Sequence, residues 1–504
     1  MKYLYYFLGF GIFLNIIFAS WWVLHSDIFF HVDIARDFLI LHDIVTNHNL
    51  TLIGPRSGGI LGIFHGPAWF YLNLPAFILG KGDPVIVGWF WVFLFLISLL
   101  IIYYVTLKFY SHSVALIATF LLALTQASYV RTLFNPFGAV MLAPLFFYFL
   151  VLYLKHKNIW HLTISLFVLG LLIQFQMAFG IPIAVLTTFL ILKEIYQHKK
   201  YIHILAFLIL LIPLSTYIVF EIRHDFLQTR TVLSYIQHGN NDNAQIDNYT
   251  YLSNRFMNIV FNSWYIFPES YWYLTGIFLS LFSYVIFIQK KLKATIELKV
   301  FLYLYLGYWT LSFFLKGAVV QYHYWPFASL SVICLAYYLS KLSNKLLILT
   351  IAFFSIFYLI SGIEIIKNSY QFIGKDRISW KFNYELAKSV YKDANSDFGY
   401  YVYTPDLFGY TPRYAFIFAG NSSKNKGYSF EKKPLTYLFL NPDFYSDKTY
   451  NGAYWWVEKQ VKMPSAPDKK IMYPNKIQIY KYNLTQEEMQ IPSLKEIDTG
   501  IHFR

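Results

Sequence analysis

Long apolar runs separated by short polar connections occupy the first 365 residues of the chain. An α-helix needs about 17–25 predominantly apolar residues to cross the hydrocarbon core of a bilayer. Many of the runs reach this length, although several are shorter. The pattern therefore predicts about eleven transmembrane helices, near residues 3–24, 84–107, 113–129, 137–154, 159–177, 180–194, 201–220, 270–289, 298–315, 322–340 and 345–364.

The distribution of lysine predicts the orientation of these helices. If the N-terminus is cytoplasmic, the inner connections carry most of the lysines, whereas the short outer connections carry few basic residues, such as Arg131 and Lys316. Cytoplasmic connections of membrane proteins are enriched in Lys and Arg. The first run, Tyr3–Leu24, has no small-residue cleavage site and is expected to remain as a helix. The loop 25–83 and the segment 221–268 then face outward.

The stretch His25–Tyr71 in the first outer loop is rich in Asp, Arg and His. Over Asp33–Val45 the apolar residues recur at helical spacing, which predicts an amphipathic helix lying in the membrane interface. A turn-rich break follows at Gly54–Gly59, and His65–Leu79 is a second amphipathic, aromatic segment. A charged loop of this kind on a protein with many spans favours chemistry at the membrane surface over a plain pore or anchor.

The hydropathy falls after about residue 365, where short segments separated by Pro, Gly and Asn replace the long apolar runs. Several of these segments have a β-like composition: GYYVYT, YAFIFAG, LTYLFLN, WWVEKQV and IQIYKYN. We therefore expect a transmembrane domain over residues 1–365 and a small soluble α/β or β-rich domain over 366–504. An odd number of spans places this second domain on the outer side.

Composition supports the membrane assignment and excludes other classes. The chain has 504 residues, of which 57% are hydrophobic and only 13% are charged, whereas a soluble domain has about 25% charged residues. The aromatic content of 21% is typical of interfacial belts. The net charge of +14 is not a nucleic-acid signal, because many lysines lie in short connections. A single cysteine, Cys334, excludes an intramolecular disulfide and a thiolate metal cluster.

Asp33 and Arg36 are the leading candidates for catalysis. They are three residues apart on an expected helix, so their side chains point the same way. A carboxylate beside a cation stays ionised at neutral pH, as a general base requires. Arg36, Arg56 and His65 together suit a phosphate or pyrophosphate, because a planar guanidinium binds phosphate oxygens in pairs. The alternative is a solvated interfacial helix with ordinary ion pairs.

A second interpretation of the loop is a metal site. His25, Asp27, His31 and Asp33 alternate at short spacing, and both residue types are ligands for zinc or manganese. The chain must turn here from a span into the interfacial helix, so the sequence does not fix their register. The alternative is a set of polar residues at the level of the lipid headgroups. No metal ligand is assigned, and a divalent metal ion is the one cofactor left open.

Other polar residues fall in the predicted outer connections, where charges are costly unless they are solvated or paired. Further candidates for phosphate binding are Arg223, His224 and His323. Candidates for other substrate contacts are Asp37, Asn135, Gln174, Gln176, Asp225 and Tyr324. The alternatives are a helix cap at Asn135, interhelical hydrogen bonds for the glutamines and solvated helix ends. Because these clusters fall on one face, they predict one outward cavity suited to a lipid-linked phosphate.

Short motifs surround these candidates in a recognisable order. They are VDIARD at Val32–Asp37, GIFHGPAWFYL at Gly62–Leu72, FNPFGAV at Phe134–Val140, FEIRHDFLQTR at Phe220–Arg230 and YHYWPF at Tyr322–Phe327. In order and position they resemble the GT-C membrane glycosyltransferases, most closely the protein O-mannosyltransferase-like group and the aminoarabinose transferases that modify lipid A. The resemblance covers the membrane portion of the chain, and the C-terminal domain is less diagnostic.

The resemblance implies a reaction and roles for three residues. Such enzymes transfer a sugar from a polyprenyl-phosphate carrier to an acceptor hydroxyl outside the cytoplasm. It implies that Asp33 is the general base on the acceptor and that Arg36 and His65 contact the carrier phosphate. Related enzymes often have Lys at the position of His65, so a phosphate contact here depends on protonation of the histidine. A second carboxylate often follows the third span, and Asn135 stands at that position in this chain.

The expected protein is an inverting, polyprenyl-phosphate-dependent glycosyltransferase of the bacterial plasma membrane with an outward active site. Its expected partners are the lipid-linked sugar donor, a protein, lipid or glycan acceptor, and membrane lipids, with no nucleic acid. A lipid-linked oligosaccharide polymerase or ligase would share the donor chemistry and differ in the acceptor. A lipid-glycan transporter or flippase is disfavoured, because such proteins typically contain inverted repeats and this sequence has no evident repeat.

Overall fold

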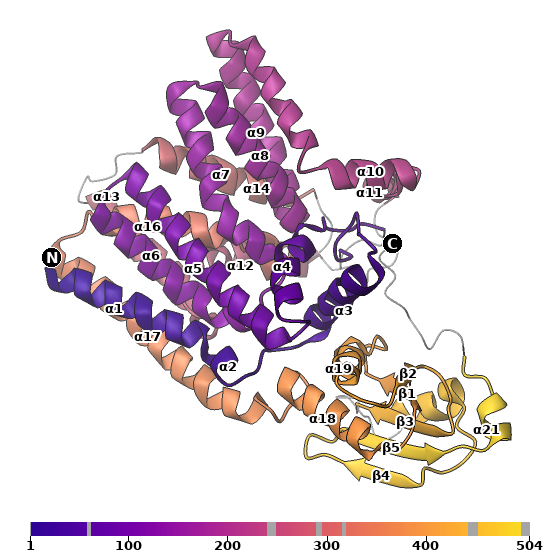
Figure 1. Ribbon diagram of the computed structural model, residues 1–504. Helices are drawn as coiled ribbons and strands as arrows, with labels where there is room; N and C mark the ends of the chain where they lie inside the picture. The colour runs from indigo at the N-terminus through magenta and orange to yellow at the C-terminus, as the bar shows by residue number, and fades with distance from the viewer. Residues whose placement is uncertain are drawn as a thin grey trace.

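The computed structural model describes residues 2–57, 62–238, 248–288, 295–314, 319–441 and 452–494. Lys316 and the Asn-rich part of the segment 221–268 lie outside these residues. Within them the chain forms a large bundle of apolar helices and a small C-terminal domain with a β-sheet (Figure 1). This arrangement confirms the predicted fold class.

Five helices of the described chain are long and apolar enough to cross a membrane. They are α5 (Pro84–Phe109), α6 with its extension η1 (His112–Thr132), α7 (Pro136–His156), α9 (Met177–His198) and α17 (Asn344–Phe372). A break that contains Pro213 joins η2 (Tyr201–Leu211) to α10 (Ser215–Arg223) at a bend of 65°, and this pair makes a sixth candidate span. The protein is therefore an integral membrane protein.

The shorter predicted runs are helical as well. They form α1 (Lys2–Ala19), α8 (Ile159–Phe175), α13 (Tyr273–Ile288), α14 (Ile296–Ser312) and α16 (Phe327–Leu339). The position of a helix in the bundle decides how much of it is covered by protein. The apolar window of α6 is 78% buried, whereas that of α17, at the edge beside α1, is only 17% buried (Figure 1). An uncovered apolar surface of this kind is suited to contact with lipid.

The helix expected over Asp33–Val45 is present as α3 (Val32–Asn47), and the second amphipathic segment, His65–Leu79, contains α4 (Ala68–Leu79). α3 begins after His31, which has an extended backbone and accepts a hydrogen bond from a backbone N–H of the first turn. It ends at His48, whose φ of 57° lies in the left-handed region that commonly terminates helices. The apolar residues of α3 are buried, in part against Phe77 of α4, which fixes the direction of its polar side chains.

The later part of the membrane portion consists of short helices and turns. After α10 come α11 (Leu227–His238), α12 (Asn248–Val260), η3 (Asn262–Trp264) and η4 (Glu269–Tyr271). A single four-residue turn, α15 (Gln321–Tyr324), precedes α16. These elements pack at the same end of the bundle as α3 and α4, through contacts described below.

The C-terminal domain is built on a mixed five-stranded sheet in the order β2-β1-β3-β5-β4. β1 (Phe398–Tyr403) is parallel to its neighbours β2 (Gly427–Ser429) and β3 (Leu435–Leu440). β5 (Gln478–Asn483) is antiparallel to β3 and to β4 (Lys469–Met472). β1 and β3 are buried along their whole length, as strands covered on both faces are. The helices α18 (Trp380–Asp393) and α19 (Tyr410–Gly420) complete the domain.

Two segments expected to be strands are helical instead. YAFIFAG lies in α19, and WWVEKQV lies in α20 (Gly452–Trp455) and the π-helical turn η5 (Trp456–Val461). A short apolar run does not distinguish a strand from a buried helix, and α19 buries its apolar residues on more than one side. The predicted domain boundary at residue 365 lies inside α17, which continues to Phe372.

Candidate active site

Asp33 lies in the first turn of α3, at the end of the bundle that meets the C-terminal domain (Figure 1). His31 fixes this turn, because its Nδ1 accepts the backbone N–H of Asp33 at 3.2 Å. The Asp33 side chain is 49% exposed. A ligand can therefore reach this carboxylate.

Arg36 joins Asp33 to Asp37. Its Nη1 donates to Asp33 Oδ1 at 2.7 Å, and its Nε and Nη2 donate to Asp37 Oδ1 at 3.0 and 2.7 Å. The Arg36 side chain is largely buried, where salt screens an ion pair less than at the surface. The pair expected from the sequence is therefore present, and Asp37 adds a second carboxylate to it.

Asp37 is the buried carboxylate of this group. Its Oδ2 has no hydrogen-bond partner in the described part of the chain. Burial raises the pKa of Asp37 to about 6, although the adjacent Arg36 acts in the opposite direction. Asp33 and Asp37 therefore occupy different environments, and Asp33 is the one that combines a cationic partner with access for a ligand.

His65 approaches the same region from the loop before α4. Its backbone N–H donates to the carbonyl of Pro55 at 2.8 Å, and its carbonyl accepts the N–H of Gly54 at 2.7 Å. A Cβ atom on Gly54 would lie 2.1 Å from the carbonyl oxygen of Gly66, so this close approach requires glycine. The His65 side chain is buried, and its Nδ1 has no hydrogen-bond partner among the residues that the structure describes.

Positive charge and burial keep two histidines neutral. Burial, together with the charges of His323 and Arg36, lowers the pKa of His65 to about 3. Burial and the charge of Arg255 lower the pKa of His323 to about 4. Both imidazoles are thus neutral near pH 7, and the lasting positive charge here belongs to arginine. We refer to Asp33, Arg36, Asp37, His65 and His323 as the Asp33 cluster.

α15 directs two of its residues toward this cluster. Burial raises the pKa of Tyr322, and the charge of Asp33 raises it further, so the two side chains are near each other. Gln176 holds α15 in place, because its Nε2 donates to the carbonyl of Tyr322 at 2.9 Å. Tyr324 instead donates its hydroxyl to Oδ1 of Asn258 at 3.0 Å. Of the two tyrosines, Tyr322 lies beside Asp33, whereas the sequence analysis selected Tyr324.

The other predicted amide residues connect helices. Asn135 Nδ2 donates to the carbonyl of Phe175 at 2.7 Å, and its side chain makes no capping bond at the start of α7. Gln174 Nε2 donates to the carbonyl of Pro213 at 2.7 Å, at the break between η2 and α10. The sequence left two interpretations of Gln174 and Gln176, a substrate contact or an interhelical hydrogen bond. The structure contains an interhelical hydrogen bond for each of them.

The remaining predicted phosphate ligands have no described contact with Asp33. Arg56 and Arg223 are exposed, as is Asp225, which was predicted for other substrate contacts. His224 stacks on Phe220, with the ring centroids 4.1 Å apart. Gln228 of α11 contacts the loop that contains His65. Its Oε1 accepts the backbone N–H of Phe64 at 2.9 Å. A phosphate role for Arg56, Arg223 and His224 and another substrate contact for Asp225 stay predictions.

Asp27 connects the first loop to the C-terminal domain. Its Oδ2 accepts hydrogen bonds from Ser379 Oγ at 2.5 Å and Gly374 N–H at 3.1 Å, and its Oδ1 accepts the N–H of Lys381 at 3.0 Å. These bonds occupy both oxygens of the buried carboxylate. Within the described ranges, no group of three or more His, Cys, Asp or Glu side chains is placed to hold a metal ion.

α19 of the C-terminal domain covers α3. Tyr414 packs on Phe38 with the ring centroids 5.3 Å apart. Burial raises the pKa of Tyr410, and the nearby charges of Arg36 and Asp33 act on the same hydroxyl. The C-terminal domain therefore supplies a hydroxyl group beside the candidate base.

Three residues near the cluster were missed by the sequence analysis: Tyr322, Arg255 and Tyr410. Tyr322 precedes His323 in the YHYWPF motif, so its place in that motif was a usable signal. Arg255 and Tyr410 belong to no motif that links them to Asp33. Folding alone brings them together.

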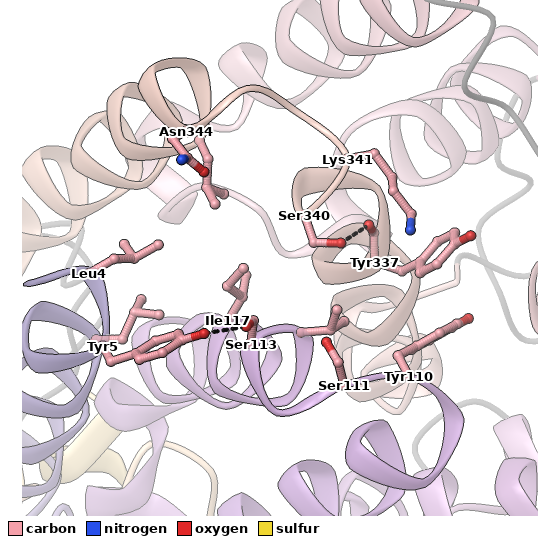
Figure 2. A pocket seen from close by; sticks show the side chains of 13 residues that line it. Leu4, Tyr5, Tyr110, Ser111, Ser113, Ile117, Tyr337, Ser340, Lys341 and Asn344 are labelled. Atoms are coloured by element: carbon pink, nitrogen blue, oxygen red, sulfur yellow. Dashed lines mark hydrogen bonds between the residues drawn. The ribbon is translucent and has the colours of Figure 1, made fainter. Parts of the chain in front are cut away.

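A different cavity, of about 400 Å³, lies at the opposite end of the bundle (Figure 2). It adjoins the end of α16, a helix of 13 residues that begins near the Asp33 cluster and is therefore about 20 Å long. Hydroxyl groups dominate its polar lining, and those of Tyr5 and Ser113 are 2.5 Å apart. Lys341 is the one charged residue among the described residues that line it. With no carboxylate, this cavity is not the candidate active site.

Known structures resemble the whole chain. ArnT from Cupriavidus metallidurans bound to undecaprenyl phosphate aligns with a TM-score of 0.58 at 10% identity, covering 95% of this chain and 98% of that one. ArnT in the apo state aligns with a TM-score of 0.56 at 8% identity and the same coverage. The apo oligosaccharyltransferase of Archaeoglobus fulgidus reaches a TM-score of only 0.44 at 12% identity, covering 82% and 64% of the two chains. No protein-family model and no curated protein sequence matches the chain.

The similarity to ArnT includes both the helical bundle and the C-terminal domain, because it extends over 95% of the chain. At 10% identity it shows a shared fold. This chain therefore has an ArnT-like GT-C fold, and the fold implied by the sequence motifs is confirmed.

Proposed function

We propose that this protein transfers a sugar from a polyprenyl-phosphate carrier to an acceptor hydroxyl. The observation that carries the proposal is the accessible carboxylate of Asp33, 49% exposed and bonded to Arg36, in a chain with an ArnT-like fold. ArnT has been solved with undecaprenyl phosphate bound. A lipid phosphate suits the guanidinium and imidazole groups that surround Asp33.

In this proposal Asp33 is the general base. It accepts the proton of the acceptor hydroxyl while that oxygen attacks the anomeric carbon of the sugar. The bond between the anomeric carbon and the phosphate oxygen breaks, and the polyprenyl phosphate leaves with the bonding electrons. Attack from the face opposite the leaving group inverts the anomeric configuration. Arg36 orients the carboxylate through its Nη1 hydrogen bond.

The leaving phosphate needs hydrogen-bond donors, because negative charge develops on it. His65 is suited to this role, since its buried Nδ1 has no partner in the described structure and a neutral imidazole can donate one N–H. An anion bound here would favour protonation of His65 and His323. We further propose that the site faces outward from a bacterial plasma membrane.

The test is transfer of a labelled sugar by the full-length protein in lipid vesicles, with a panel of polyprenyl-phosphate donors and the product identified by mass. Asp33→Asn should lower the rate by about 10²–10⁴-fold, the usual contribution of a general base. Asp43→Asn is the matched control, because Asp43 lies on the same helix and contacts Asn47 instead. Normal turnover by a folded Asp33→Asn protein would refute the role of Asp33. Products with many repeated units would indicate a polymerase.

A further inference from the structure

A second polar cavity lies on the other side of α15 from the Asp33 cluster, and we call it the rear cavity. Its volume is about 800 Å³, within the range of sites that bind small ligands. Gln321 and Tyr324 of α15 line it. Tyr322 and His323, between them in sequence, interact with Asp33 and His65 instead. The short helix α15 therefore separates two polar sites.

Segments far apart in the sequence form the walls of the rear cavity. They belong to α1, η1, α17 and the stretch from α12 to η4. Glu364 is the single acidic residue of α17. A carboxylate in a helix long enough to cross a membrane is costly and normally faces a polar interior or a water-filled space. Glu364 is exposed, and its position in this lining agrees with a cavity that water can reach.

Two residues of the lining have unsatisfied polar atoms. Arg131 Nε and Thr132 Oγ1 are both buried, and neither has a hydrogen-bond partner in the part of the chain that the structure describes. A buried polar group without a partner is destabilising. The guanidinium of Arg131 is held over the rings of Trp22 and Phe29, at 5.8 and 5.3 Å from their centroids. Because both atoms are shielded from solvent, a ligand in the cavity would instead meet the accessible amides and hydroxyl groups of the lining.

The charges of the lining disfavour an anionic ligand. Two carboxylates, Glu269 and Glu364, stand against one guanidinium, Arg131, so the described lining has a net charge of −1. Arg131 is the one basic residue of this described lining, and its guanidinium is held over two aromatic rings, so the lining offers few donors to a phosphate. The charges therefore do not favour phosphate, and the amides and hydroxyl groups of the lining remain to select the ligand.

The rest of the lining suits a molecule with many hydroxyl groups. Amides come from four separate elements, and hydroxyl side chains lie between them. An amide both donates and accepts, so it can pair with a sugar hydroxyl in either direction. Aromatic rings of Tyr265 and Trp272 offer flat apolar surfaces for the C–H face of a sugar ring. The amide residues are Asn15, Asn262, Gln321 and Asn368.

We propose that the rear cavity is a binding site for an uncharged saccharide, distinct from the site at Asp33. Asp33 and Arg36 do not line it. Saccharide binding in the rear cavity is therefore separate from the transfer reaction at Asp33.

Two glycines give a matched pair of variants to test it. Gly362 of α17 lines the rear cavity, and a Cβ atom there would meet only Phe18, at 4.0 Å. A Cβ atom on Gly9 of α1 would meet nothing within 4 Å, and Gly9 does not line the cavity. Gly362→Leu and Gly9→Leu therefore add the same side chain to an apolar helix without a backbone clash, and Gly362→Leu alone fills the cavity.

The experiment titrates the full-length protein in lipid nanodiscs with neutral trisaccharides of glucose, mannose, galactose and N-acetylglucosamine, with heat of binding as the readout. At least one trisaccharide should bind to the wild type and to Gly9→Leu with equal affinity. Gly362→Leu should weaken that binding by about tenfold or more. Asp33→Asn should leave it unchanged, which separates this site from the proposed reaction.

Three results would overturn the inference. The first is that no trisaccharide of the panel binds to the wild type. The second is that Gly362→Leu binds as tightly as Gly9→Leu, which would place the sugar elsewhere. The third is that inorganic phosphate displaces the bound trisaccharide, which would identify an anion site.

Discussion

The two sites on either side of α15 are built from different kinds of polar residue. In the Asp33 cluster, Arg36 contacts two carboxylates directly, and two neutral histidines lie beside them. In the rear cavity the three charged residues come from separate elements, and amides, hydroxyls and aromatic rings fill the space between them. Charges in contact fix the position of one reactive oxygen, whereas dispersed donors and acceptors suit a ligand with many hydroxyls. We therefore expect changes in the first site to affect rate and changes in the second to affect binding.

The strongest test of this comparison replaces one carboxylate with its amide in each site. Asp33→Asn should lower sugar transfer by about 10²–10⁴-fold and leave trisaccharide affinity unchanged. Glu269→Gln should weaken trisaccharide binding and have a much smaller effect on the transfer rate. Both readouts are taken on the same preparations. If either variant changes both readouts equally, the two regions form one site.

Removal of Arg36 tests whether the contacts of the Asp33 cluster also support the fold. Arg36→Ala should lower the free energy of unfolding by about 3 kcal/mol, because breaking a buried ion pair leaves an uncompensated charge. Protonation of Asp37, whose pKa is already about 6, limits this loss. Arg223→Ala, at an exposed position, should change stability by no more than about 0.5 kcal/mol. Denaturant unfolding measures the free energy of unfolding of the two variants. Equal values would contradict a stabilising buried ion pair at Arg36.

The buried histidines give the Asp33 cluster a pH dependence. The pKa of such a histidine is lower in the folded state than in the unfolded state. The protein is therefore most stable at a pH above the unfolded pKa, and it loses stability as the pH falls from the unfolded pKa toward the folded pKa. For His65, with a folded pKa of about 3, the loss between pH 7 and pH 5 is about 2 kcal/mol relative to an unfolded pKa near 6.5. His65→Gln should remove this part of the pH dependence. His48→Gln, at an exposed position, should retain it.

The smallest expected effect concerns the C-terminal domain. Tyr410 of α19 lies beside Asp33 and Arg36, whereas no described residue after Asn368 lines the rear cavity. Tyr410→Phe should lower sugar transfer by about 2–10-fold, the effect of one hydrogen bond, and leave trisaccharide binding unchanged. Tyr384→Phe in α18 is the control for the loss of a hydroxyl in the same domain. A loss of trisaccharide binding by Tyr410→Phe would mean that the domain influences both sites.

The apolar runs predicted the helices well, because their length and composition are properties of contiguous segments. All eleven predicted segments contain helix, and the segment Asp33–Val45, predicted to be helical, lies in α3. The tail was predicted less well. YAFIFAG is as compatible with a buried helix as with a strand, and its packing against α3 and α18 places it in α19. Periodicity is weak evidence when a short segment is apolar on every side.

The same distinction applies within the active-site region. The spacing of Asp33 and Arg36 on one helix was enough to predict their ion pair, since a contact between residues three apart depends on local geometry alone. The sequence could not predict that Asn135 would bond to Phe175 or that Asp27 would bond to Ser379. Each of these contacts joins elements whose relative position depends on the packing of the whole bundle.

The sequence by itself determined that this is a membrane protein, where most of its helices begin and end, and which carboxylate stands beside an arginine. Those features depend on hydropathy and on contacts between near neighbours in the chain. Tertiary structure alone decided that His65 and His323 are neutral, that Tyr410 lies beside Asp33, and that α15 separates two polar sites. Burial, charge and cavity shape at a point arise from segments that are distant in sequence, so they become defined only when the helices pack.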